Sequence, residues 1–224
     1  MNIKEIEWND LALQPEAIRG DGPDKPLENL IQVGNPFVLN ALEFYKKSKQ
    51  VDAAMSLLYK ENDFFYVRFP LSFRPTDKLS LDLVSVEIAL QGAEDIEAYS
   101  MQPQKVEEET KIGVNAKIDS KLGISPIELS SSIGSSEEYV TYQPVIEAFN
   151  LGTNTPAWEF RPTKGRSLSG IQILHLVIRQ SKNSKSEGTI SVTGDARDKR
   201  GIFSFWGKNK KSNEHAVNFC CPTS

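Results

Sequence analysis

The feature that most constrains this chain is a regular alternation of apolar and polar residues near its middle. From Ile112 to Ile124, every second position is apolar except Ser120, and the positions between are polar or glycine. A period of two places the two sets of side chains on opposite faces of a β-strand, whereas a helix needs a period of 3.6. At about 3.3 Å per residue the segment predicts a strand on the order of 40 Å long, or two strands divided at Ser120.

Other segments show the same preference for strands. The stretch from Leu79 to Leu90 alternates but changes its apolar parity near Leu83 and Val84, which predicts a β-bulge there. Short aromatic and β-branched segments, separated by Gly, Pro, Ser and Asn, predict further strands. They cover residues 64–69, 96–101, 139–149, 157–160, 170–180, 188–193 and 202–206. Short strands at this spacing are typical of an antiparallel β-sandwich or partial barrel.

The N-terminal part has a helical and not a strand-like pattern of apolar residues, and we expect a short helical region there. Asn35 and Pro36 form a typical helix start, and an apolar pattern follows from Phe37 to Tyr45. A second short helix is expected over residues 52–59. We therefore predict three parts. Residues 1–62 are an irregular and helical region packing on the sandwich, residues 63–210 are the β-sandwich domain, and residues 211–224 are a flexible C-terminal tail.

The net charge of −4 hides an uneven distribution. Residues 1–160 hold 14 Lys and Arg against 26 Asp and Glu, whereas residues 161–224 hold 12 against 4. The first part therefore carries −12 and the second +8. Such a charge-polarised chain can bind a protein partner or associate with itself head to tail, and it can equally neutralise itself within one molecule. A non-enzymatic binding or assembly module is our first hypothesis for the function.

A basic and aromatic segment near the C-terminus is the candidate contact surface for a partner or an anionic surface. Cations beside aromatic rings suit lipid headgroups, and they also suit single-stranded DNA or RNA. Nucleic acid is the less favoured partner because the acidic remainder repels a polyanion. A strand between two solvated basic loops explains the same composition. The candidate residues are Arg197, Lys199, Arg200, Phe203, Phe205, Trp206, Lys208, Lys210 and Lys211.

The alternating segment supplies an alternative function. After a polar tract over residues 130–138, a return strand is expected from Tyr139 to Ile146. An amphipathic hairpin over residues 112–146 could lie on or enter a membrane, because strands of about ten residues cross a bilayer. The competing interpretation is a strand with its apolar face on the core of a soluble sandwich.

No catalytic motif is visible, so we expect neither an enzyme nor a bound cofactor or metal. His175 belongs to the expected strand 170–180 and lies on the face opposite Leu174 and Leu176. Trp158 and Phe160 share a face and are expected to anchor one end of the core.

The two cysteines, Cys220 and Cys221, are adjacent and have no third cysteine to pair with, which favours a reducing compartment. Cys221 is the first residue of a poor match to a prenylation box, and two adjacent cysteines can also be palmitoylated. Both cysteines are therefore candidates for lipidation. Since the N-terminus has no signal-peptide pattern, we expect an intracellular protein, either cytoplasmic or peripheral to a membrane.

Overall fold

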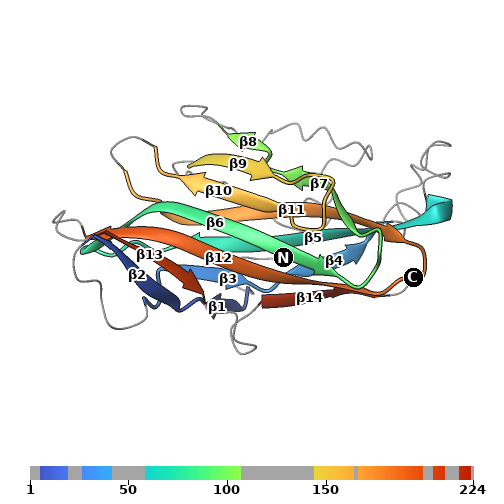
Figure 1. Cartoon of the computed structure of the whole chain (residues 1–224), viewed down its shortest axis with the longest axis horizontal. Helices are drawn as coiled ribbons and strands as arrows, with labels where there is room; N and C mark the ends of the chain where they lie inside the picture. The colour runs from blue at the N-terminus through green and yellow to red at the C-terminus, as the bar shows by residue number, and fades with distance from the viewer. Residues whose placement is uncertain are drawn as a thin grey trace.

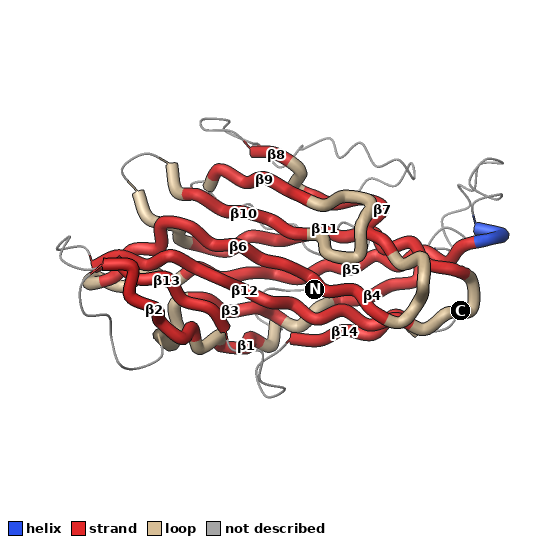
Figure 2. Tube along the Cα trace, in the orientation of Figure 1, coloured by secondary structure: helices blue, strands red, loops and turns tan. Residues whose placement is uncertain are grey.

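The computed structural model describes residues 6–19, 27–41, 59–106, 144–163, 166–198, 204–209 and 217–222. These residues form two antiparallel sheets packed face to face, which confirms the predicted sandwich (Figure 1). Helix is confined, within these ranges, to Ala41 and the single turn at residues 59–61 (Figure 2).

The first sheet has the strand order β1-β3-β5-β11-β7, and β4 also pairs with β5. Its longest strands, β5 and β11, are antiparallel partners along their whole length. The bounds are β1 (Trp8–Asp10), β3 (Ile31–Gly34), β4 (Phe37–Asn40), β5 (Asn62–Phe73), β7 (Glu97–Gln102) and β11 (Gly170–Ser181).

The second sheet has the order β2-β13-β12-β6-β10-β9-β8, and β14 pairs with β12 beyond the end of β13. Its bounds are β2 (Leu13–Arg19), β6 (Leu79–Gln91), β8 (Lys105–Val106), β9 (Val145–Phe149), β10 (Ala157–Arg161), β12 (Ser186–Asp198), β13 (Ser204–Asn209) and β14 (Val217–Cys221).

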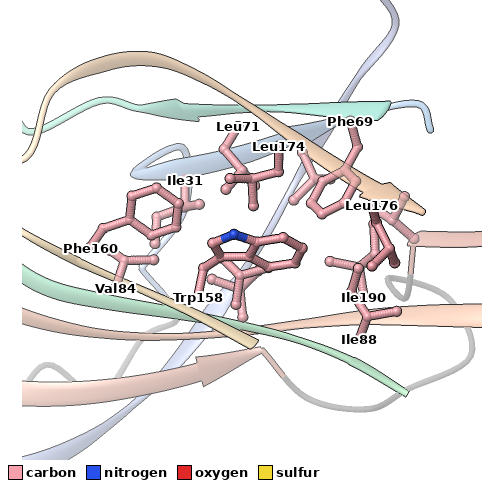
Figure 3. Packing of buried hydrophobic residues seen from close by; sticks show 14 of the residues in the cluster. Ile31, Phe69, Leu71, Val84, Ile88, Trp158, Phe160, Leu174, Leu176 and Ile190 are labelled. Atoms are coloured by element: carbon pink, nitrogen blue, oxygen red, sulfur yellow. The ribbon is translucent and has the colours of Figure 1, made fainter. Parts of the chain in front are cut away.

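The core fills the space between the two sheets. Trp158, on β10, has no exposed surface, and its ring meets that of Phe69 edge to face at 6.0 Å between centroids. Figure 3 shows Trp158 surrounded by side chains of both sheets. Phe160, two residues along β10, contacts Phe73 in the same way at 5.2 Å. The predicted role of Trp158 and Phe160 as core anchors is confirmed, because a strand places residues i and i+2 on one face.

The predicted bulge lies one residue before the expected position. In the ladder between β6 and β12, Leu83 pairs with Asp195 and Leu81 pairs with Ala196. Asp82 therefore has no residue opposite it on β12. The extra residue moves the buried positions from Leu81 to Val84, and alternate residues are buried from Val84 onwards. The parity change in the sequence is therefore the direct result of the bulge.

The helix predicted from Pro36 is wrong over Phe37–Asn40, which form β4 and pair with β5. The free edge of β5 offers backbone partners to these residues, and such tertiary pairing overrides a weak local helix signal. The expected helix at residues 52–59 lies outside the described residues except for Tyr59, which begins the turn at 59–61. Residues 8–40 supply four strands to the two sheets.

Two further segments differ from the expectation. The strand expected to stop at Pro70 continues to Phe73. Pro70 is tolerated because β4 pairs with β5 only as far as Arg68 and β3 resumes the pairing at Leu71, so Pro70 faces a gap on that edge. Val217–Cys221, which the sequence assigns to a flexible tail, instead form β14.

Candidate functional site

The candidate site begins where β8 and β9 meet at the edge of the second sheet. Lys105 is the partner of Glu147, and Val106 is the partner of Ile146. The described residues on either side of segment 107–143 therefore lie next to each other at this edge, where Figure 1 shows β8 beside β9. Val106 and Ile146 are both buried in the core, which anchors the two ends of the connection. The alternating segment itself lies outside the described residues, whereas β9 is the final part of the expected strand 139–149.

Backbone and side-chain hydrogen bonds hold this edge in place. The indole N–H of Trp158 donates to the carbonyl of Pro103 at 3.0 Å, and the N–H of Ala148 donates to the carbonyl of Gln104 at 2.8 Å. Both bonds fix the residues that lead into β8. The residues that lead into β8 are therefore held by a hydrogen bond from the fully buried Trp158 side chain, in addition to backbone contacts at the surface.

A cleft of about 330 Å³ lies where several strands of both sheets begin or end. Pro144, which precedes β9, forms part of its wall. Leu168 is buried in the core, and its N–H donates to the carbonyl of Leu81 at 3.0 Å, so the segment between β10 and β11 is fixed against β6. The lining residues are Pro75, Pro144, Pro162, Thr163, Arg166, Ser167, Leu168 and Ser169.

The sequence interpretation did not single out Arg166 or its neighbours. The available signal was a short polar stretch after Pro162 with Lys164 and Arg166 on either side of Gly165. The distant residues that complete the cleft, Pro75 and Pro144, join it only through the fold.

The basic aromatic segment is only partly covered by the structure. Arg197 is the last residue of β12 that pairs with β13. It also forms an ion pair with Asp82, at 3.0 Å between Nε of Arg197 and Oδ2 of Asp82. Phe205, Trp206 and Lys208 belong to β13, which lies between β12 and β2 and is therefore not an edge strand. The role proposed for these residues stays a prediction. The remaining candidates lie outside the described residues: Lys199, Arg200, Phe203, Lys210 and Lys211.

The positive and negative parts of the chain are interleaved in the sheets. The strands β11 and β12 come from the basic part of the chain. β11 lies between β5 and β7 of the acidic part, and β12 lies beside β6 of the acidic part. Three ion pairs in the described ranges join a cation after residue 160 to a carboxylate before it. They are Arg161–Glu159 at 2.6 Å, Arg179–Glu97 at 3.0 Å and Arg197–Asp82 at 3.0 Å. These pairs neutralise some cations of the basic part within the molecule, and the charge-polarised binding surface stays a prediction.

His175 takes part in a polar cluster on the outer face of the first sheet. Its Nδ1 lies 2.5 Å from the hydroxyl oxygen of Tyr66, and Arg68 is its direct partner on β5. Burial, together with the charge of Arg68, lowers the pKa of His175 to about 4. Burial also raises the pKa of Tyr66. At neutral pH the Tyr66 hydroxyl therefore donates to a neutral imidazole, which is a structural hydrogen bond between two uncharged groups.

The position predicted for His175 is confirmed, since Leu174 and Leu176 are buried on the opposite face. Its partner Tyr66 was not predicted, because the two residues lie 109 positions apart.

The two cysteines have different environments. Cys220 is exposed and Cys221 is buried, as expected for consecutive residues of β14. Burial raises the pKa of Cys221 to about 12, so its thiol is protonated at neutral pH. A lipid on Cys221 would require β14 to leave the sheet. Cys220 is therefore the accessible lipidation candidate, and lipidation of either residue stays a prediction.

The described residues show neither a metal-binding cluster nor a membrane-spanning helix. They contain no group of three His, Cys, Asp or Glu side chains placed to hold a metal ion. Within the same residues, no helix has the length and apolar character needed to cross a membrane.

Comparison with known proteins gives little further information. No protein-family model matches the chain, and no curated protein matches it. Among solved structures, it is similar to the NetB toxin of Clostridium perfringens in its membrane-inserted form, with 9% sequence identity and a TM-score of 0.40. The alignment covers 96% of this chain and 95% of the toxin chain. At this TM-score and identity, the likeness carries no inference about function.

Proposed function

We propose that the protein is membrane-active and that the part of the expected 112–146 hairpin that precedes β9 enters a lipid bilayer as an amphipathic β-hairpin. The observation that carries the proposal is the antiparallel pairing of β8 with β9, which brings the two ends of the 107–143 connection together at a sheet edge. A chain segment that joins two adjacent antiparallel strands is placed to extend them as a hairpin. The sandwich then acts as the platform from which the hairpin projects.

The sequence of the connection suits this role. Apolar residues at alternate positions from Ile112 to Ile124 would face lipid, and the intervening polar residues would face water. About ten residues of strand are enough to cross the hydrocarbon layer, and the alternating segment exceeds that length. A polar tract over residues 130–138 would form the part of the hairpin beyond the bilayer.

Self-association follows from this proposal on physical grounds. A single hairpin in lipid leaves the outer backbone N–H and C=O groups of both strands unpaired, at a cost of several kcal/mol for each group. Hairpins from several copies must pair edge to edge to remove that cost. The expected assembly is therefore formed on the membrane, and its driving force is backbone hydrogen bonding rather than charge.

Dye release from liposomes tests the proposal with a matched pair of variants. Val114→Ser with Ile118→Ser removes two apolar side chains of the alternating segment, and we expect it to abolish most of the release. Asn115→Ser with Asp119→Ser changes two positions of the opposite parity, and we expect it to retain release. Thermal melting of both proteins checks that each sandwich is folded.

The same experiment includes the outcome that would contradict the proposal. If folded wild-type protein stays in the soluble fraction with both neutral and anionic liposomes and releases no dye, the membrane function fails. The competing proposal, a binding module for a protein partner, would then be the better one. Equal loss of release in both double variants would also contradict the assignment of a lipid-facing parity.

A further inference from the structure

We infer, on the basis of the membrane function proposed above, that the turn after β9 is a contact surface for a second copy of this chain in the membrane-bound assembly. The turn carries Phe149 and Leu151, which are 36% and 44% exposed. They are two of the three exposed large apolar residues in the described ranges, and the third, Ile173, lies on β11 of the other sheet. Phe149 and Leu151, two positions apart, form a small apolar tip on the sandwich.

Hydrogen bonds within the turn hold the apolar tip in place. The side-chain amide of Asn150 donates to the carbonyl of Thr155 at 3.0 Å, and the hydroxyl of Thr153 donates to the carbonyl of Asn150 at 2.8 Å. Asn150 and Gly152 have positive φ angles of 59° and 81°, which reverse the chain sharply. Single exposed apolar side chains are common on soluble proteins, but this pair lies on a turn with its own hydrogen-bond network.

The turn is also tied to both sheets. On the first sheet, the N–H of Gly152 donates to the carbonyl of Ala98 on β7 at 2.9 Å, and the N–H of Ala98 donates to the carbonyl of Thr153 at 2.8 Å. On the second sheet, the N–H of Leu90 on β6 donates to the carbonyl of Asn154 at 2.8 Å. A partner therefore meets a tip that loses little conformational freedom, which lowers the cost of binding.

The apolar tip lies at the edge of the sandwich from which the proposed hairpin extends. Among the described strands, β8 pairs with β9 only at Ile146 and Glu147, so β9 is the outermost strand of the second sheet where it reaches Phe149. Hairpins that pair edge to edge repeat at about 10 Å, because neighbouring strands lie about 4.8 Å apart. Two packed sheets are already about 10 Å apart without their outer side chains. Neighbouring sandwiches are therefore brought into contact beside this edge.

A second copy fits this position better than lipid does. The strand β9 begins at Val145, next to the 107–143 connection, and ends at Phe149. At about 3.3 Å per residue, the apolar tip is on the order of 15 Å from the end of β9 where the hairpin starts. A bilayer that receives the hairpin lies on that side, so the tip is at the end of the strand away from the lipid.

The surroundings of the apolar tip also suit a protein partner. Phe149 pairs with Ala157 on β10, and Ala157 pairs with Glu87 on β6. Glu87 is exposed, as are Thr153 and Asn154 of the turn. An apolar centre with a polar rim is typical of contacts between proteins. A carboxylate beside the tip disfavours an anionic lipid surface.

The test variant is Phe149→Ser with Leu151→Ser. Phe149→Leu with Leu151→Met, which keeps both positions apolar, is the matched control. Ile173→Ser is a second control, because it removes a similarly exposed apolar side chain from the other sheet. Leu151→Ser alone changes one exposed side chain and is used if the double serine variant does not fold, which thermal melting detects. We expect the single variant to lose part of the assembly.

Each protein is mixed with phosphatidylcholine vesicles and with vesicles that also contain phosphatidylserine. Flotation measures the bound fraction, and amine cross-linking of that fraction followed by a denaturing gel measures assembly. We expect the double serine variant to bind vesicles within about twofold of the wild type and to give about tenfold less cross-linked oligomer, because a few central residues carry most of the binding energy of an interface. Both controls should assemble as the wild type does.

Selective loss of cross-linked oligomer in the serine variants of the turn supports the contact surface. Unchanged cross-linking would overturn it, as would equal loss in Ile173→Ser. Loss of vesicle binding in the serine variants of the turn would also overturn it, because this result indicates contact with lipid. These three outcomes leave the membrane function standing if the wild type releases dye. A wild type that neither binds vesicles nor releases dye removes both proposals, so failure of the contact surface alone is recognisable.

Discussion

At the scale of single residues, His175 makes stability depend on pH. Its pKa is about 4 in the folded protein and 6.5 in an unfolded chain. Between these values the unfolded state binds the proton more tightly, so stability falls as the pH is lowered from about 6.5 towards 4. The difference between the two pKa values corresponds to about 3 kcal/mol of stability, since one pKa unit is about 1.36 kcal/mol.

We expect His175→Gln to flatten the dependence of the unfolding free energy on pH within this window. Urea denaturation at a series of pH values measures the slope. His215→Gln, which removes the other histidine, is the matched control and should retain it. An unchanged slope in His175→Gln would show that other groups are responsible.

At the scale of structural elements, β14 is held by a contact between Phe219 and Gly188. The Phe219 ring covers the backbone of Gly188 so closely that a β-carbon at position 188 would overlap it. Val217, Phe219 and Cys221 point into the core from this strand. The glycine is therefore required by close packing and not by an unusual backbone angle.

Gly188→Ala should displace Phe219 and loosen β14. Reaction with a thiol reagent measures this, because Cys221 is buried and Cys220 is exposed. We expect one fast-reacting thiol in the wild type and two in Gly188→Ala. Gly194→Ala on the same strand is the control, since its nearest neighbour would be 3.4 Å away and the change should be tolerated. Continued protection of Cys221 in Gly188→Ala would contradict the packing argument.

At the scale of the whole molecule, the opposite charges are distributed between neighbouring strands. Ion pairs such as Arg179–Glu97 link the basic part of the chain to the acidic part within each sheet. Exposed pairs of this kind contribute only about 0–1 kcal/mol each to stability, but each also neutralises a cation that would otherwise be available to attract a second copy.

We therefore expect light scattering without lipid to give the mass of one chain at both low and high salt. Assembly should appear only when liposomes are present. A mass that rises at low salt and falls at high salt would instead support head-to-tail association through a charge-polarised surface, because salt screens such attraction.

The amino-acid sequence alone determined the β-rich character, most long strands and the side chains that face the core. Strands β6, β10 and β11 follow from their alternation, and the bulge near Leu83 follows from a change of parity. These properties are local, because the faces of a strand are set by the period of its own residues.

Tertiary structure alone decided which strands become neighbours and which distant residues meet. Phe37–Asn40 form a strand because the edge of β5 is available to them, although their local pattern resembles a helix. The pairing of β8 with β9, the contact of Tyr66 with His175, and the cleft around Arg166 all join residues far apart in the chain. Such contacts depend on the free energy of the complete fold. The residue pattern of a single segment therefore does not predict them.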